Sequence, residues 1–102
     1  MPVFCVRLIP PRPSFPADIT PQEGAAMMQH VAYWTAFANQ GKAILFGPVA
    51  DPAGSWGLGV IEAADEAELR AFLDDDPVMR GDLGFRQEVS LMPRGVVTRP
   101  GL

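Results

Sequence analysis

The segment that most constrains the fold is PPRPSFPADITP at residues 10–21, where five of twelve positions are proline. Proline has no backbone N–H and fixes φ, so this segment can form neither the interior of a helix nor a central strand. It must be a loop. Ordered loops of this length are often binding loops or lids, and a connector packed on the surface would have an equally suitable composition.

The first helix is predicted to follow this loop directly. Thr20 suits the N-cap, Pro21 suits the first helical position, and Glu23 completes a capping box. The helix should run to about Gln40, because Gly41 is typical of the position just after a helix end.

A second helix and four strands complete the pattern. Asp65 and Glu68 predict another capping box, and the helix they begin should end before Pro77. Strands are expected at residues 3–9, 43–46, 56–61 and 85–92. The order βαββαβ predicts an α+β, ferredoxin-like fold, with a four-stranded antiparallel sheet and both helices on one face. We expect one domain at residues 1–94 and a tail at 95–102.

The predicted strands carry apolar residues on both faces of the sheet. In the first strand, one face carries Phe4, Val6 and Leu8 and the other carries Val3, Cys5 and Ile9. Two helices on one side leave the other apolar face exposed, which favours association. We therefore expect a homodimer that packs sheet against sheet.

Two glycines leave space on one face of the third strand. Strand alternation puts Gly57 and Gly59 on one face and Trp56 on the other. Because glycine has no side chain, an aromatic ring, a helix or a ligand could approach closely there.

The composition excludes several classes of function. The net charge is −4 and no basic run is present, which argues against a nucleic-acid partner. No apolar stretch is long enough to span a membrane, and no signal peptide is predicted. The single cysteine, Cys5, cannot form an internal disulfide, and we expect a buried thiol and a cytoplasmic protein.

The sequence contains one histidine, His30, within the segment QHVAYW of the first predicted helix. At 100° per residue, four apolar or aromatic residues fall within about 60° of it: Met27, Tyr33, Trp34 and Phe37. The imidazole therefore lies on the apolar face of the helix. It is either a general base or a core residue bonded to a backbone carbonyl, and the second is commoner for a lone histidine.

Several segments, in this order, resemble the YCII-related (YciI-like) family. They are the opening strand, H-V-A-Y-W at residues 30–34, L-F-G-P at 45–48, D-P-A-G-S-W-G-L at 51–58, D-D-P at 75–77 and E-V-S-L-M-P at 88–93. The resemblance covers about residues 2–93. It implies a ferredoxin-like protomer in a dimeric α+β barrel. The long proline-rich loop departs from the shorter members of the family.

The resemblance also implies a catalytic pair and a chemistry. The family's histidine falls on His30, its aspartate on Asp76 and a serine of the last strand on Ser90. The implied activity is acid–base work on small molecules, of the lyase or isomerase kind. A carboxylate bonded to the imidazole would orient it and stabilise its protonated form. Asp76 has a plainer alternative role, as the cap of the turn that Pro77 begins.

Four further residues are candidates for contact with a ligand. Ser90 lies in no nucleophile motif, so it can only bind. Arg7 could bind a substrate carboxylate, but an ion pair with Glu88 is favoured. Trp34 and Trp56 are expected to be walls of a mostly apolar pocket for an aromatic or anionic molecule.

No cofactor is predicted. One histidine and one cysteine do not make a recognised metal site, and no phosphate-binding glycine pattern opens a helix. Two hypotheses remain. The first is a cofactor-free enzyme that uses His30 and Asp76. The second is a non-catalytic small-ligand binder or accessory dimer with a structural histidine.

Overall fold

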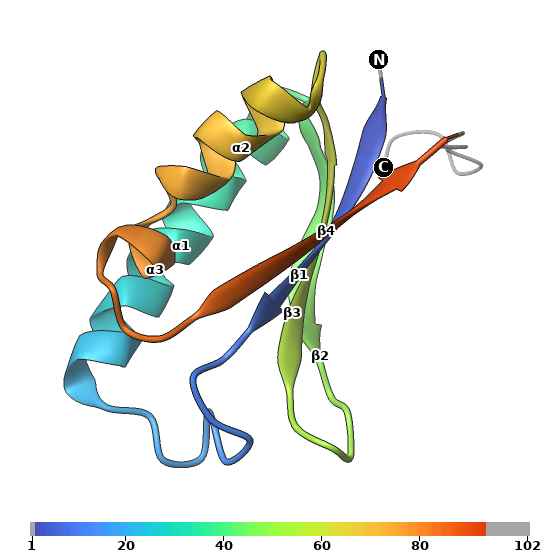
Figure 1. Cartoon of the computed structure of the whole chain (residues 1–102). Helices are drawn as coiled ribbons and strands as arrows, with labels where there is room; N and C mark the ends of the chain where they lie inside the picture. The colour runs from blue at the N-terminus through green and yellow to red at the C-terminus, as the bar shows by residue number, and fades with distance from the viewer. Residues whose placement is uncertain (1, 94–102) are drawn as a thin grey trace.

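The computed structural model describes residues 2–93 (Figure 1). Residue 1 and residues 94–102, which include the predicted tail at 95–102, lie outside the described residues. The elements in chain order are β1 (Val3–Ile9), α1 (Pro21–Asn39), β2 (Ala43–Val49), β3 (Trp56–Glu62), α2 (Glu66–Asp74), α3 (Pro77–Arg80) and β4 (Arg86–Met92).

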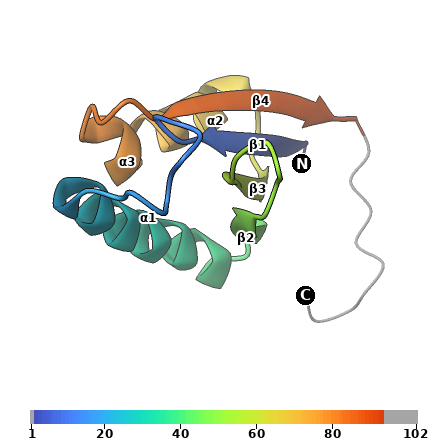
Figure 2. The same ribbon diagram turned by 90° about the horizontal axis from the view of Figure 1, so that it is seen from below.

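The four strands form one antiparallel sheet in the order β2-β3-β1-β4. The three helices lie together on one side of this sheet (Figure 1). The other side, which we call the open face, carries no helix. Figure 2 shows the proline-rich loop running from β1 to α1 across the end of the molecule. The predicted α+β, ferredoxin-like arrangement is confirmed.

Helix α1 begins and ends where its sequence indicates. The Thr20 side chain accepts a hydrogen bond from the Glu23 backbone N–H at 3.2 Å, and the Glu23 carboxylate accepts one from the Thr20 backbone N–H at 2.9 Å. The capping box is therefore complete. Gly41 follows the helix with φ of 77°, a left-handed conformation that glycine adopts without strain.

The second predicted capping box is only half formed. Asp65 accepts from the Glu68 backbone N–H at 2.8 Å, as expected. The Glu68 carboxylate, however, accepts from the backbone N–H of Ala64 at 3.3 Å rather than from that of Asp65. The extended backbone at the N-cap presents the preceding N–H to Glu68, so the reciprocal bond of a capping box is replaced.

Strand β2 is longer than predicted, since it continues from Phe46 through Pro48 to Val49. Its register pairs Pro48 with Gly57 of β3. β2 is an edge strand, where a missing N–H can face away from the sheet. A proline that would break a central strand is therefore tolerated here.

The main core fills the space between the sheet and the helices. Nine buried residues form it: Phe4, Val6, Trp34, Ala43, Ile61, Ala63, Leu69, Phe72 and Leu73. Burial of such side chains from α2 and from β1 supplies the main driving force for folding. Alternation along β1 therefore assigns the faces of the sheet as predicted, with Phe4 and Val6 toward the helices.

Gly59 of β3 makes room for an aromatic ring, one of the three groups considered for the glycine face. A Cβ built at Gly59 would lie 2.4 Å from Cη2 of the Trp34 indole, far inside the contact distance of two carbon atoms. The absent side chain lets the indole of Trp34 lie directly on the sheet.

The open face is apolar at its middle. The strand registers align Leu45, Val60, Cys5 and Ser90 in a row across β2, β3, β1 and β4. Leu45 is 52% exposed, and Cys5 is a free, half-buried thiol rather than the buried thiol predicted. The reason is that alternation along β1 points Cys5 away from the helices.

Gly59→Ala should destabilise the fold by about 1–3 kcal/mol, because the added methyl must displace the Trp34 indole or the strand. Urea unfolding followed by circular dichroism measures this change. Gly47→Ala is the matched control, since a Cβ at Gly47 would meet nothing within 4 Å. Equal unfolding free energies for the two variants would contradict this account of Gly59.

Candidate active site

A cavity of about 500 Å³ lies between the sheet, α1 and the proline-rich loop. Its lining is almost entirely apolar. The residues of α1 that line it are Met27, His30, Val31 and Trp34; those of the loop include Phe15, Pro16 and Ile19; those of β2 and β3 include Phe46, Pro48 and Trp56. Its size and character suit a small organic molecule. His30, Trp34 and Trp56 all line this cavity, and their role in ligand binding stays a prediction.

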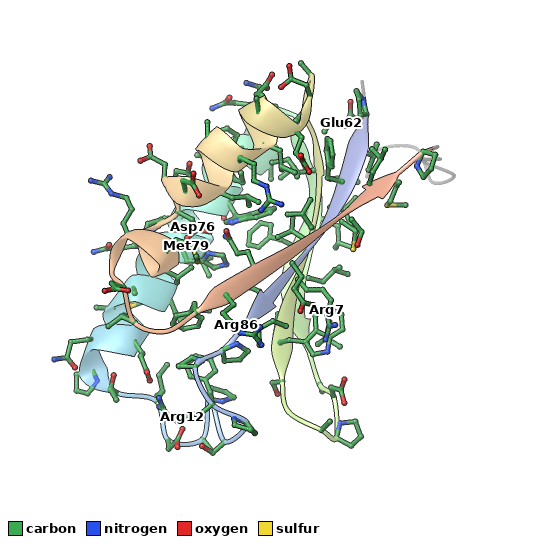
Figure 3. All side chains as sticks on the ribbon, in the orientation of Figure 1. Arg7, Arg12, Glu62, Asp76, Met79 and Arg86 are labelled. Carbon is green, nitrogen blue, oxygen red and sulfur yellow. The ribbon has the colours of Figure 1, made fainter. Side chains whose placement is uncertain are left out.

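His30 is hydrogen-bonded to Asp76. Its Nδ1 lies 2.9 Å from Oδ1 and 2.8 Å from Oδ2 of the Asp76 carboxylate. The side chain of Asp76 is fully buried, whereas that of His30 is 13% exposed. The partner of the imidazole is thus a carboxylate and not a backbone carbonyl. This contact joins the middle of α1 to the junction of α2 and α3, where Figure 3 labels Asp76.

Two further donors hold the carboxylate of Asp76. The Trp34 indole Nε1–H donates to Oδ2 at 2.8 Å, and the Val78 backbone N–H donates to Oδ1 at 3.1 Å. Asp76 is therefore the N-cap of α3 as well as the partner of His30. Its capping role and its contact with the histidine, which the sequence left as alternatives, occur together.

These contacts favour one tautomer of His30. Each oxygen of Asp76 already accepts from an obligate donor, so the consistent partner from the imidazole is Nδ1–H. No hydrogen bond within residues 2–93 involves Nε2, and no buried side-chain nitrogen in that range lacks a partner. Nε2 is therefore not fully buried, and its lone pair has no hydrogen-bond partner among the described residues.

An ion-pair cluster fastens the proline-rich loop to α1. Both terminal nitrogens of Arg12 donate to the Glu23 carboxylate at 2.7 Å, and Nε of Arg12 lies 2.9 Å from Asp18. The hydrogen bonds from Arg12, followed by the one from the Thr20 backbone, hold the pKa of Glu23 at about 2, below its ordinary 4.5. Sequence patterning did not identify this pairing, since nothing local links Arg12 to Glu23.

The other candidate residues are divided between the two faces of the sheet. Arg7 is paired with Glu88 at 3.3 Å, as favoured, and its guanidinium lies 4.3 Å from the centre of the Trp56 ring. Ser90 is aligned with Cys5 on the same open face, away from His30. Trp34 lines the cavity together with His30, and both side chains are hydrogen-bonded to the Asp76 carboxylate. Trp56 also lines the cavity.

Comparison with known proteins agrees with this architecture. The YCII-related domain family matches residues 3–93. The chain belongs to the YCII-related domain family. A solved structure of 5-chloro-2-hydroxyhydroquinone dehydrochlorinase from Burkholderia phenoliruptrix, in complex with 2,5-dihydroxybenzoquinone, is similar with a TM-score of 0.66. The alignment covers 91% of this chain and 95% of the dehydrochlorinase chain, at 19% identity, so the shared feature is the fold. No curated protein matches the chain.

The described part of this YCII-related domain offers no group for a bound metal. Across residues 2–93, no three His, Cys, Asp or Glu side chains gather in a set that could hold an ion. In the same range, no helix has the length and apolar character needed to cross a bilayer. Among the described residues that line the cavity, His30 is the one with an ionisable side chain.

Acid should weaken this YCII-related domain through Glu23. Because the folded-state pKa of Glu23 is below its ordinary value, the Arg12 cluster stabilises the fold fully above about pH 4.5, and that contribution is lost as the pH falls toward 2. The free energy of unfolding, measured by urea titration across this range, should fall less steeply for Glu23→Gln than for the wild type.

The control for the change of charge is Glu66→Gln, which removes a carboxylate from an exposed i,i+4 pair with Arg70. It should keep the wild-type slope. A Glu23→Gln protein whose stability depends on pH as the wild type does would show that the loop clamp does not titrate as described.

Proposed function

We propose that this protein is a cofactor-free acid–base enzyme of the lyase or isomerase kind, with His30 as the base and Asp76 as its orienting partner. The observation that carries the proposal is that His30 lines a cavity of about 500 Å³ while its Nδ1 contacts a fully buried carboxylate and its Nε2 makes no hydrogen bond within residues 2–93. A base needs an accessible lone pair, a fixed tautomer and a group that stabilises its protonated form.

In the proposed reaction, Nε2 of His30 removes a proton from a carbon or hydroxyl of the bound molecule. The electron pair left on the substrate either expels a leaving group or shifts along the conjugated system. The imidazolium is stabilised by the Asp76 carboxylate during this step. It then returns its proton to the leaving group, or to another atom of the substrate, which restores the free base.

The lining of the cavity favours a small aromatic or quinonoid substrate. Phe15, Trp34 and Phe46 are among its walls, and none of the described lining residues is a lysine or arginine. The similar dehydrochlorinase was solved with 2,5-dihydroxybenzoquinone, and its named substrate is a chlorinated hydroxyhydroquinone. Loss of HCl from such a ring is a reaction that a single base can support, so hydroxylated aromatic rings are the proposed substrate class.

His30→Gln should lower turnover by about 10²- to 10⁴-fold, because glutamine cannot accept the proton. Two assays detect the reaction without knowledge of the product: chloride release from chlorinated hydroxyhydroquinones, and exchange of acidic C–H for deuterium followed by NMR. The exposed neighbour Gln29→Ala is the control on the same helix and should retain wild-type rates.

Asp76→Asn distinguishes an orienting role from a structural one. The amide can still cap α3 through its oxygen, but its NH₂ group then faces Nδ1 and favours the tautomer with a protonated Nε2. Turnover should fall strongly, and ¹⁵N NMR of the single histidine should report the exchanged tautomer. Retained turnover in His30→Gln would refute the proposal, and ligand binding without turnover in the wild type would favour a binding module.

We further propose that a second copy of the chain covers the apolar middle of the open face. Leu45 and Val60 are adjacent in the sheet, and Leu45, at the edge-strand end of the row, is half exposed. The match to the YCII-related family, together with this row, supports sheet-to-sheet pairing as the way to remove apolar area from water.

Leu45→Glu should therefore convert a dimer into a monomer, because each copy would bring a carboxylate into the apolar contact, where it loses its hydration. Light scattering after size-exclusion chromatography gives the mass of each species. Leu91→Glu is the matched control, since Leu91 is 57% exposed on β4 but aligned with Phe4 on the other face. A wild type that is monomeric at micromolar concentrations would contradict the pairing.

A further inference from the structure

A second cavity, of about 350 Å³, lies at the end of the open face nearest the proline-rich loop. Three arginines line it, Arg7, Arg12 and Arg86, together with one carboxylate, Asp51. Its remaining walls come from the ends of β1 and β3, from the proline-rich loop, from the β2–β3 turn and from Gly84. Unlike the cavity at His30, it is polar and cationic.

The strand registers bring two of these arginines together. β1 and β4 pair Arg7 with Glu88 and Ile9 with Arg86, so Arg7 and Arg86 are diagonal neighbours on one face of adjacent strands. Such neighbours lie within reach of each other's long side chains. Figure 3 shows Arg7 and Arg86 on the part of the sheet that leads to the loop carrying Arg12.

The three guanidinium groups differ in how far they are already engaged. Arg12 is held by Asp18 and Glu23 through three of its nitrogens. Arg7 has one contact with Glu88, at 3.3 Å between two exposed side chains. Such exposed pairs contribute little and exchange readily.

Arg86 has no carboxylate within 4.0 Å among residues 2–93. Asp51, the acidic residue of the cavity, instead accepts from Nε1–H of Trp56 at 3.1 Å and from the Ala53 backbone N–H at 2.9 Å. The bonds from Ala53 and Trp56, with a smaller effect from the charge of Arg7, lower the pKa of Asp51.

The two cavities share three residues. Pro10, Ser55 and Trp56 line both of them, so a short wall separates the apolar cavity from the cationic one. Trp56 contacts both cavities, because it lines the apolar one while the Arg7 guanidinium of the other lies over its ring, 4.3 Å from the ring centre.

We propose that the second cavity is an oxyanion subsite, in which Arg86 and Arg7 bind the carboxylate or phosphate of a molecule whose aromatic ring occupies the cavity at His30. The part of this inference that concerns the ring rests on the proposed function; the part that concerns the oxyanion does not. Guanidinium groups suit this ligand because their planar N–H pairs match the geometry of carboxylate and phosphate oxygens. The substrate class is thereby an aryl acid or aryl phosphate with a short tether.

A titration series tests the subsite. The probes are benzoate, phenylacetate, 3-phenylpropionate, phenyl phosphate, inorganic phosphate and the neutral 3-phenylpropanamide. NMR follows the His30 ring for the first cavity and the backbone N–H of Gly84, which lines only the second, for the other. The best aryl acid should bind at least tenfold more tightly than the amide, and its affinity should fall as salt is raised, since the added contact is ionic.

Variants then locate the anion. Arg86→Gln should reduce the affinity for the best aryl acid to that of the amide, and Arg7→Gln should reduce it in the same direction. Arg70→Gln, at a half-exposed site on α2, is the matched control for lost charge and should bind as the wild type does. An acid and an amide of equal affinity, or an unchanged affinity in Arg86→Gln, would overturn the subsite.

Two outcomes separate this inference from the proposed function. His30→Gln should keep the preference for the acid over the amide even though turnover is lost, so failure of the enzyme hypothesis leaves the subsite intact. Aryl acids that bind no more tightly than inorganic phosphate, or that shift Gly84 without shifting His30, would overturn the bridging of the two cavities. Phenyl phosphate compared with the carboxylates decides which oxyanion the subsite prefers.

Discussion

The rest of the site depends on the hydrogen bonds that the buried carboxylate of Asp76 accepts. It accepts from the imidazole of His30, from the indole of Trp34 and from the backbone of Val78, so α1 and the start of α3 are fastened at one point. A buried acceptor left without its donors costs about 1–3 kcal/mol, and more when it is charged. The fold therefore has a reason to hold His30 in one orientation.

The hydrogen bond from Trp34 to Asp76 depends in turn on a glycine in the sheet. Trp34 can donate to Asp76 only because its indole lies on β3, and it can lie there only because Gly59 has no Cβ. On the other side of the cavity, the Arg12 cluster fixes the loop that carries Phe15 and Ile19. Prolines in this loop reduce the entropy that is lost when it becomes ordered. Both walls of the cavity are thus preorganised.

The sequence predicts those features that depend on neighbours along the chain. The caps at Thr20 and Asp65, the glycine after α1 and the alternation of the strands are local, and they were predicted in place, apart from the reciprocal bond of Glu68. The pairing of Arg12 with Glu23 and of Trp34 with Asp76 needs the tertiary fold, since no spacing rule links those positions. Asp76 was identified only through a family resemblance.

Residue alternation along β4 also indicates which face of the sheet carries Ser90, whereas the family resemblance grouped Ser90 with His30. In β4, Ser90 has the same parity as Glu88, and Glu88 was expected to pair with Arg7 on the face opposite Phe4. Both Ser90 and Arg7 therefore had to lie across the sheet from a base on α1. A ligand that met both faces would have to pass the end of the sheet, near the residues that the two cavities share.

The surroundings of His30 also limit which acid–base reactions the proposed enzyme could catalyse. The nearest phenol, Tyr33, donates to the Phe72 carbonyl at 2.8 Å, and burial, followed by the charges of Asp75 and Asp76, raises the pKa of Tyr33 to about 12. Its proton is therefore committed to the fold. Among the described lining residues, His30 alone has an ionisable side chain. A single base that removes a proton must also return it, so the favoured reactions are those in which both transfers occur on the substrate face that His30 meets.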